Sequence, residues 1–227
     1  MPATAVRWLA VALLAVSVSA WAADPIHVIE TRSVPPEKLP RPGAATHDLK
    51  LSLYGFKNSR WSPEDITVAV LDALPLIAQC GVAVASLELR IIDAPVKFRF
   101  FSTPVSRELL REFTVAKPAL LFVDDTYSEP AYDAEAIGLS NAETRPELSN
   151  TIWFAHGARD LSHAIAHELV HVLSDSGDHS NAPDNLMRPA TAAANTRLTD
   201  AQCNRLRDVA TANGLLTRRA GAGTPRK

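Results

Sequence analysis

The chain has 227 residues, of which 47% are hydrophobic and 21% are charged, and its formal net charge is −2. This length allows one domain, or one domain with a small lobe, and the composition is that of an ordinary folded protein. There is no basic excess and no interleaving of basic with aromatic residues, which argues against nucleic acid as a partner.

The first 22 residues have the pattern of a cleaved signal peptide. Arg7 precedes an apolar run over residues 8–18, and the Ala-Trp-Ala triplet at 20–22 has the small residues that signal peptidase requires. The apolar run is short for a membrane span, which needs about 20 residues, although a retained anchor is the alternative. We therefore expect cleavage near Ala22, a secreted or periplasmic protein, and no stable membrane association after cleavage.

The next elements are predicted in chain order from hydrophobic periodicity and end signals. Residues 23–46 are rich in proline and indicate an extended lead-in. Residues 48–56 alternate as a strand does, and Ser62-Pro63-Glu64-Asp65 predicts the start of a helix that ends at Cys80-Gly81. Further strands are expected over 86–93, 97–101, 118–125, 134–140 and 150–157, with a short helix over 104–113.

The C-terminal third is predicted to hold two more helices. One is capped by Asp160 and runs to about Ser174, and the other starts at residues 198–200 and ends near 213–214. The whole order predicts an α+β fold with a mixed twisted sheet. We expect one domain over residues 47–214, with a small C-terminal lobe from about residue 175 that holds one helix, and a flexible tail over 215–227.

The chain has two cysteines, Cys80 and Cys203. Export to an oxidising compartment permits a disulfide between them. Such a bridge closes a loop of more than a hundred residues, for which chain entropy gives a stabilisation of about 4–5 kcal/mol. Two separate free thiols are the alternative.

Residues 167–171 read His-Glu-Leu-Val-His, an H-E-x-x-H motif on a predicted helix. Side chains four residues apart lie one turn apart on one face, so His167 and His171 can point to one metal ion. Glu168 lies beside them and can reach a metal-bound water without being a ligand. Zinc lowers the pKa of that water, and Glu168 can take its proton as the water attacks a carbonyl. The motif therefore indicates one catalytic Zn²⁺ with Glu168 as the general base.

The third protein ligand is less clearly indicated. Enzymes that use a glutamate take it from a later helix, and no Glu follows Glu168, so that class is excluded. His179 follows Gly177, where the chain can turn sharply toward the ion. The candidates are Asp175, Asp178, His179 and Asp184 downstream, and His163 one turn upstream.

With Asn185-Leu186-Met187 following, the segment resembles the metzincin clan of zinc endopeptidases. Their signature is H-E-x-x-H-x-x-G-x-x-H, followed by a turn that contains Met beneath the metal. The order of elements is similar over about residues 47–213, although only 167–187 are specific. The resemblance implies a zincin or metzincin-like fold. It also implies zinc ligands His167, His171 and His179, with Glu168 as general base and Met187 in the Met-turn.

The segment departs from this signature in its turn. Ser174 stands at the glycine position and Gly177 at the position of the third histidine, so His179 comes two residues late. We expect a two-residue insertion in which Gly177 makes the turn; ligation by Asp178, or next by Asp175, is the alternative. Met187 as an ordinary core residue also stays open.

The resemblance further implies that an edge strand, here residues 136–139, binds the substrate backbone by strand addition. An ordinary edge strand is the alternative.

The sequence as a whole predicts an exported zinc-dependent endopeptidase. Its partner would be a peptide or protein substrate, and a monomer is the default expectation. A non-catalytic zinc-binding or protein-binding module on the same fold is one alternative, although a structural site has no use for a general base such as Glu168. A zinc amidase that acts on cell-wall amides is the other.

Overall fold

The structure is a computed structural model that describes residues 25–126, 136–139 and 146–220. The predicted signal peptide lies outside these residues. The helices are α1 (Pro63–Ala78), α2 (Thr103–Glu112), α3 (Leu161–Ser174) and α4 (Asp200–Ala212). The strands are β1 (His27–Ser33), β2 (His47–Phe56), β3 (Val82–Asp93), β4 (Phe100–Phe101), β5 (Ala119–Val123), β6 (Asp125–Thr126), β7 (Ala136–Leu139), β8 (Thr151–Ala155) and β9 (Leu216–Arg218).

The main sheet has the strand order β1-β3-β2-β5-β8-β7. Its four inner strands, β3, β2, β5 and β8, run parallel to one another, and the outer strands β1 and β7 are antiparallel to their neighbours. β9 pairs antiparallel with the start of β2, and β4 and β6 form a separate short pair. The predicted mixed sheet is therefore confirmed, in a mixed α/β arrangement.

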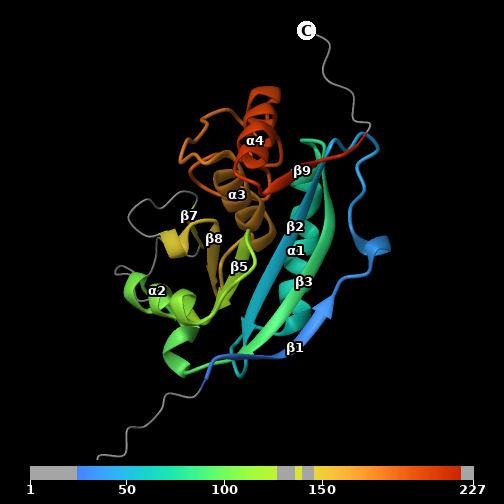
Figure 1. Cartoon of the computed structure of the whole chain (residues 1–227). Coiled ribbons are helices and arrows are strands. Elements are labelled where there is room, and N and C mark those ends of the chain that lie inside the picture. Colours follow the sequence, from blue (N-terminus) through green and yellow to red (C-terminus); the bar gives the residue numbers. More distant parts are fainter. Residues whose placement is uncertain (1–24, 127–135, 140–145, 221–227) are drawn as a thin grey trace, which may run out of the picture.

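The helices cover both faces of this sheet (Figure 1). Alternate residues of the inner strands point to opposite faces: Leu49, Leu51 and Leu53 pack with α1 and α3, whereas Tyr54 and Phe56 belong to the core on the α2 side. All five residues of β5 are buried, as its continuous apolar sequence predicts for a central strand. α3 is thus held between the sheet, α1 and α4.

α1 begins at a capping serine, and its other end is joined to α4. The side chain of Ser62 caps α1 by accepting a hydrogen bond from the Asp65 backbone N–H at 3.0 Å, as predicted. The predicted disulfide is formed between Cys80, just after α1, and Cys203 in α4. Arg207 of α4 also donates a hydrogen bond to the Cys80 carbonyl at 2.6 Å. α4 is therefore attached to the rest of the core by a covalent bond as well as by packing.

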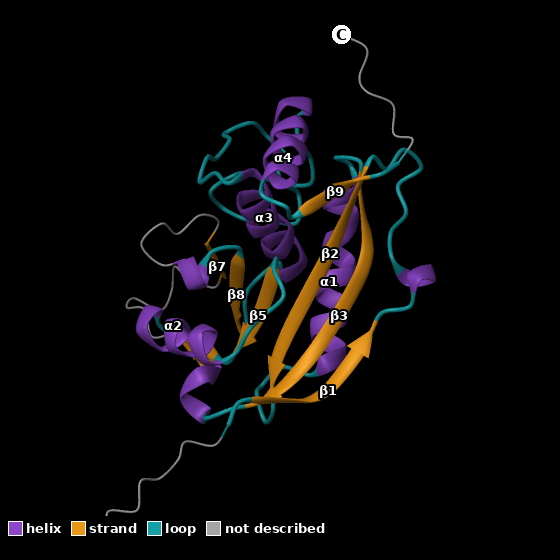
Figure 2. Cartoon of the chain, viewed as in Figure 1, coloured by secondary structure: helices purple, strands orange, loops and turns teal. Residues whose placement is uncertain are grey.

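Two strands occur where the sequence indicates irregular chain. β1 lies in the expected lead-in and β9 at the start of the expected tail (Figure 2). All seven residues of β1 are exposed, so they show no alternation; the strand exists because it pairs with β3. The expected strand over 97–101 is also wrong in part. Residues 96–99 form a 3₁₀ turn that buries Phe98, and only residues 100 and 101 form a strand, β4.

Residues 175–199, between α3 and α4, contain no helix or strand. Among the described residues, no helix is both long and apolar enough to cross a membrane.

Candidate metal centre

The centre is built on the part of α3 that faces the irregular segment. Ile165, Leu169 and Val172 fix the rotation of α3 because they are fully buried in the core. This rotation leaves His167 and His171 on the side toward residues 175–187. Asp160 precedes the helix in a left-handed conformation, with φ of 47°, and its side chain makes no capping hydrogen bond, so the predicted side-chain cap is wrong.

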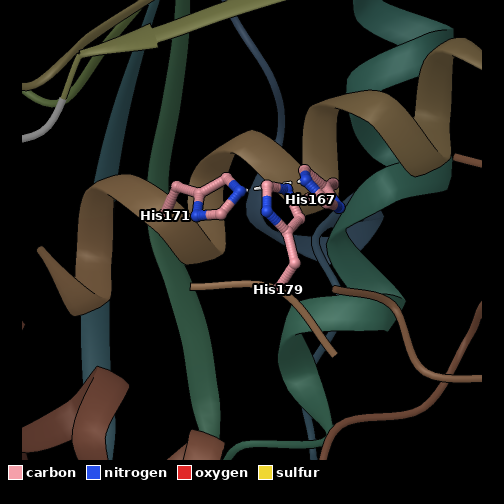
Figure 3. A group of neighbouring side chains, drawn as sticks. All are labelled: His167, His171 and His179. Atoms are coloured by element: carbon pink, nitrogen blue, oxygen red, sulfur yellow. Dashed lines mark hydrogen bonds between the residues drawn. The ribbon is translucent and has the colours of Figure 1, made fainter. Parts of the chain in front are cut away.

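Three histidines meet at this place. His167 and His171 come from α3 and His179 from the irregular segment, and one ring nitrogen of each lies within 4.8 Å of the others. The rings point toward one another (Figure 3). The Nε2 atoms of His167 and His171 are 3.0 Å apart. Two nitrogens bound to one tetrahedral zinc at 2.0–2.1 Å would be about 3.3 Å apart. The spacing therefore suits a shared metal ion.

The backbone orients two of the three rings. Nδ1 of His167 lies 2.8 Å from the Leu186 carbonyl, and Nδ1 of His171 lies 2.6 Å from the Ser176 carbonyl. A carbonyl oxygen only accepts hydrogen bonds, so each Nδ1 carries the hydrogen and each Nε2 presents a lone pair to the centre. Two lone pairs that face each other repel unless a cation lies between them. Two histidines that share a metal ion present their lone pairs to it in this way.

The protonation state of the rings also fits metal binding. Burial lowers the pKa of His167 to about 4, although the Leu186 carbonyl opposes this shift. Burial likewise lowers the pKa of His171 below its usual value. Both imidazoles are therefore neutral near pH 7, and only a neutral imidazole has a lone pair to donate to a metal.

The chain turns toward the third histidine at Asp175, and the prediction that Gly177 makes this turn is wrong. Asp175 adopts a left-handed conformation, with φ of 45°. Its N–H donates to the Val172 carbonyl at 3.4 Å, and the Ser176 N–H donates to the His171 carbonyl at 3.2 Å, as at many helix ends. Ser174, at the glycine position of the metzincin signature, remains helical. The helix therefore continues through Ser174 and ends at Asp175, and His179 follows in irregular chain.

The acidic alternatives are not brought into the cluster. The Asp178 carboxylate accepts a hydrogen bond from Ser176 Oγ at 2.7 Å and pairs with Arg205 of α4 at 3.1 Å. These two partners lower the pKa of Asp178, the Ser176 hydroxyl most strongly. Among the described residues, the candidate metal group holds the three histidines alone, without Asp175, Asp178, Asp184 or His163.

Residues 185–187 lie against the centre, although their role as a Met-turn stays a prediction. Met187 is 2% exposed, its N–H donates to Asn185 Oδ1 at 2.9 Å, and its carbonyl accepts from the Ser180 N–H at 2.8 Å. Leu186 supplies the carbonyl that orients His167. The turn therefore contacts the site in two places. The Leu186 carbonyl orients His167, and the Met187 carbonyl binds Ser180, the residue after His179.

Two further predicted features are Glu168 of α3 and the strand at the edge of the sheet. Glu168 is half-buried in α3, next to His167 in the chain. The strand predicted over 134–140 is confirmed as β7, which forms the edge of the sheet beside β8. Catalysis by Glu168 and substrate binding by β7 both stay predictions.

Two α4 residues near the site escaped the sequence analysis. Gln202 forms hydrogen bonds with Asn185, and Arg205 contacts the end of α3 and Asp178. The pattern Thr199-x-x-Gln202 is a recognisable capping box, and the structure forms it. Nothing local to the sequence shows that the same glutamine reaches Asn185.

The site and fold together define a mixed α/β protein with a three-histidine site that can hold a metal ion. No family model matches the chain, and no curated protein matches it. Among solved structures it is similar to metalloproteinase-II from Bacteroides fragilis, with a TM-score of 0.49 and 20% sequence identity. The match covers 74% of this chain and 55% of that one, so the chain spans little more than half of its neighbour's length. At this distance, a function has to be inferred from the site itself.

Proposed function

We propose that this protein is an exported, metzincin-like zinc endopeptidase. In this proposal His167, His171 and His179 bind one Zn²⁺, and Glu168 is the general base for peptide-bond hydrolysis. The observation that carries the proposal is the convergence of nitrogens from three histidines, two of which lie on the helix that also carries Glu168.

The ligand set favours zinc in a catalytic rather than a structural role. Imidazole nitrogen suits zinc, and structural zinc sites generally use four protein ligands, whereas catalytic sites use three and leave one position open. Within the described part of the chain, three side chains form the group. A bound zinc supplies a Lewis acid that polarises a carbonyl and lowers the pKa of water.

The protein's own contribution follows from the placement of Glu168. A carboxylate one residue from His167 can accept a proton from the attacking water and pass it to the leaving amine. The predicted signal peptide and the disulfide support an exported protein. β7 is the last strand of the sheet in the described part of the chain, and an extended peptide could add beside it as a further strand.

The test compares zinc-loaded wild-type protein with Glu168→Gln in a peptide-library digest, with and without chelator. Loss of a general base costs about 10²–10⁴-fold in rate, so we expect Glu168→Gln to fold, bind one zinc and lose activity by that factor. Glu112→Gln, at the exposed end of α2, is the matched control and should cleave as the wild type does.

Each outcome of the digest separates this proposal from its alternatives. Turnover retained by Glu168→Gln contradicts the assigned general base. Zinc binding by the wild type without cleavage of any peptide favours a binding module. Cleavage of cell-wall amides in a parallel digest, without cleavage of peptides, favours the amidase.

A further inference from the structure

The third metal-binding histidine lies in a segment without helix or strand, so another element must hold it in place. Residues 175–187 carry His179 and also the carbonyls of Ser176 and Leu186, which orient the other two rings. A shift of this segment would therefore disturb all three histidines at once. α4 lies directly beside it (Figure 1).

Gln202 of α4 holds the turn beneath the site. Its side-chain N–H donates to Asn185 Oδ1 at 3.1 Å, and its Oε1 accepts from Asn185 Nδ2 at 3.0 Å. Asn185 is 3% exposed, so this reciprocal amide pair is shielded from water on one side. Asn185 Oδ1 also accepts the Met187 N–H, which fixes the Leu186 carbonyl that faces His167.

Arg205, one turn further along α4, holds the other end of the segment. Its Nε donates to the Ser174 carbonyl at 3.3 Å, at the end of α3, and its Nη1 pairs with Asp178 at 3.1 Å. Asp178 directly precedes His179. Both charged side chains are more than half exposed, so this pair alone stabilises little. Its effect is geometric, because it connects the end of α3 to the residue before the third histidine.

We propose that Gln202 and Arg205 are positioning residues for the metal site, and that α4 acts as a clamp on residues 175–187. This proposal depends on the proposed zinc site and adds the residues that hold it in place. Neither residue is one of the three histidines, and both act through the backbone that presents them. Partners one step removed from a metal typically change its affinity by about 10–100-fold, so an indirect clamp belongs at the lower end of that range.

Gln202→Glu is the decisive variant because it removes a contact with residues 175–187 and leaves the cap of α4 in place. A glutamate keeps the acceptor that Gln202 offers to the Thr199 N–H at 2.8 Å, and acidic residues are favoured in the first turn, so α4 itself should stay intact. The side-chain N–H that Gln202 donates to Asn185 is lost, and a carboxylate oxygen then faces Asn185 Oδ1. We expect zinc affinity to fall roughly tenfold, and the visible absorption of the Co²⁺-loaded protein to change.

Asn204→Asp is the matched control, since it makes the same change of charge in the same helix. Its side chain contacts Arg207 and not residues 175–187. Zinc affinity and the Co²⁺ spectrum should stay at wild-type values. A second pair, Arg205→Gln with Arg207→Gln as its control, repeats the comparison with two arginines of α4, one of which faces the segment while the other contacts the Cys80 carbonyl.

The measurements are zinc affinity by competition with a chromophoric chelator, the Co²⁺ spectrum and the melting temperature of the metal-free protein. The clamp is overturned if both Gln202→Glu and Arg205→Gln bind zinc within twofold of wild type with an unchanged spectrum. It is also overturned if their affinity falls no more than in the matched controls. A wild-type protein that binds no zinc contradicts the proposed site itself, which is a distinguishable result.

Discussion

His179 differs from the other two histidines of the centre because it is exposed and comes from irregular chain, whereas His167 is almost fully buried. We expect His179→Ala to weaken zinc binding by about a hundredfold or more, beyond the effect of a residue that only supports a ligand. Asp178→Asn should cost much less, because its carboxylate is turned toward Arg205. Zinc titration of both variants checks this, and loss of zinc from Asp178→Asn alone would identify the aspartate as the ligand.

Burial of His167 also predicts a pH dependence of stability. In the unfolded chain this histidine takes up a proton near pH 6.5, whereas in the folded protein its pKa is about 4. Between these values the unfolded state binds more protons, so stability present above pH 6.5 is lost as the pH falls toward 4. At about 1.4 kcal/mol per pKa unit, the loss is at most about 3 kcal/mol. Urea denaturation of the metal-free protein at a series of pH values measures it.

His167→Gln is the control for this pH dependence, because glutamine does not titrate. The variant should lose less stability than the wild type between pH 6.5 and 4. Equal slopes in the two proteins would show that other groups, and not His167, cause the effect.

At the residue scale, the sequence was informative where the geometry is local. His167, Glu168 and His171 are related by one helical turn, so their spacing alone predicts that the two histidines share a face. The end of the helix depends instead on Asp175 in a left-handed conformation. Glycine adopts this conformation most readily, so the sequence favours Gly177 over Asp175 as the residue that makes the turn. The choice between His179 and Asp178 depends on Arg205, which is distant in the sequence.

At the scale of elements, patterns that arise within a segment were predictable and partners were not. β2, β5, α1 and α3 bury alternating, continuous or helically spaced apolar residues, and the structure contains each of them. β1 and β9 bury little, and they exist because β3 and β2 offer backbone groups to pair with. α4 was predicted as a helix, but an amphipathic pattern does not say which loop its polar side chains will reach.

At the scale of the whole molecule, the disulfide connects the core to the element that supports the metal site. Cys203 lies between Gln202 and Arg205 in α4, and Cys80 follows α1, at a sequence separation of 123. Replacing both cysteines with serine removes the constraint on the unfolded chain and should lower the free energy of unfolding by about 2–5 kcal/mol. It also frees the end of α4 that carries the clamp.

We therefore expect the double serine variant to bind zinc several-fold more weakly than wild type at a temperature where both are folded. Urea denaturation measures the stability, and chelator competition measures the affinity. Ser62→Ala is a matched control, because loss of the α1 cap costs about 1 kcal/mol without touching α4. A double serine variant that is destabilised but binds zinc as tightly as Ser62→Ala would show that the disulfide stabilises the fold without acting on the site. Weaker binding in the cysteine variant alone would mean that the disulfide also supports zinc binding, because it holds α4 where Gln202 and Arg205 contact residues 175–187.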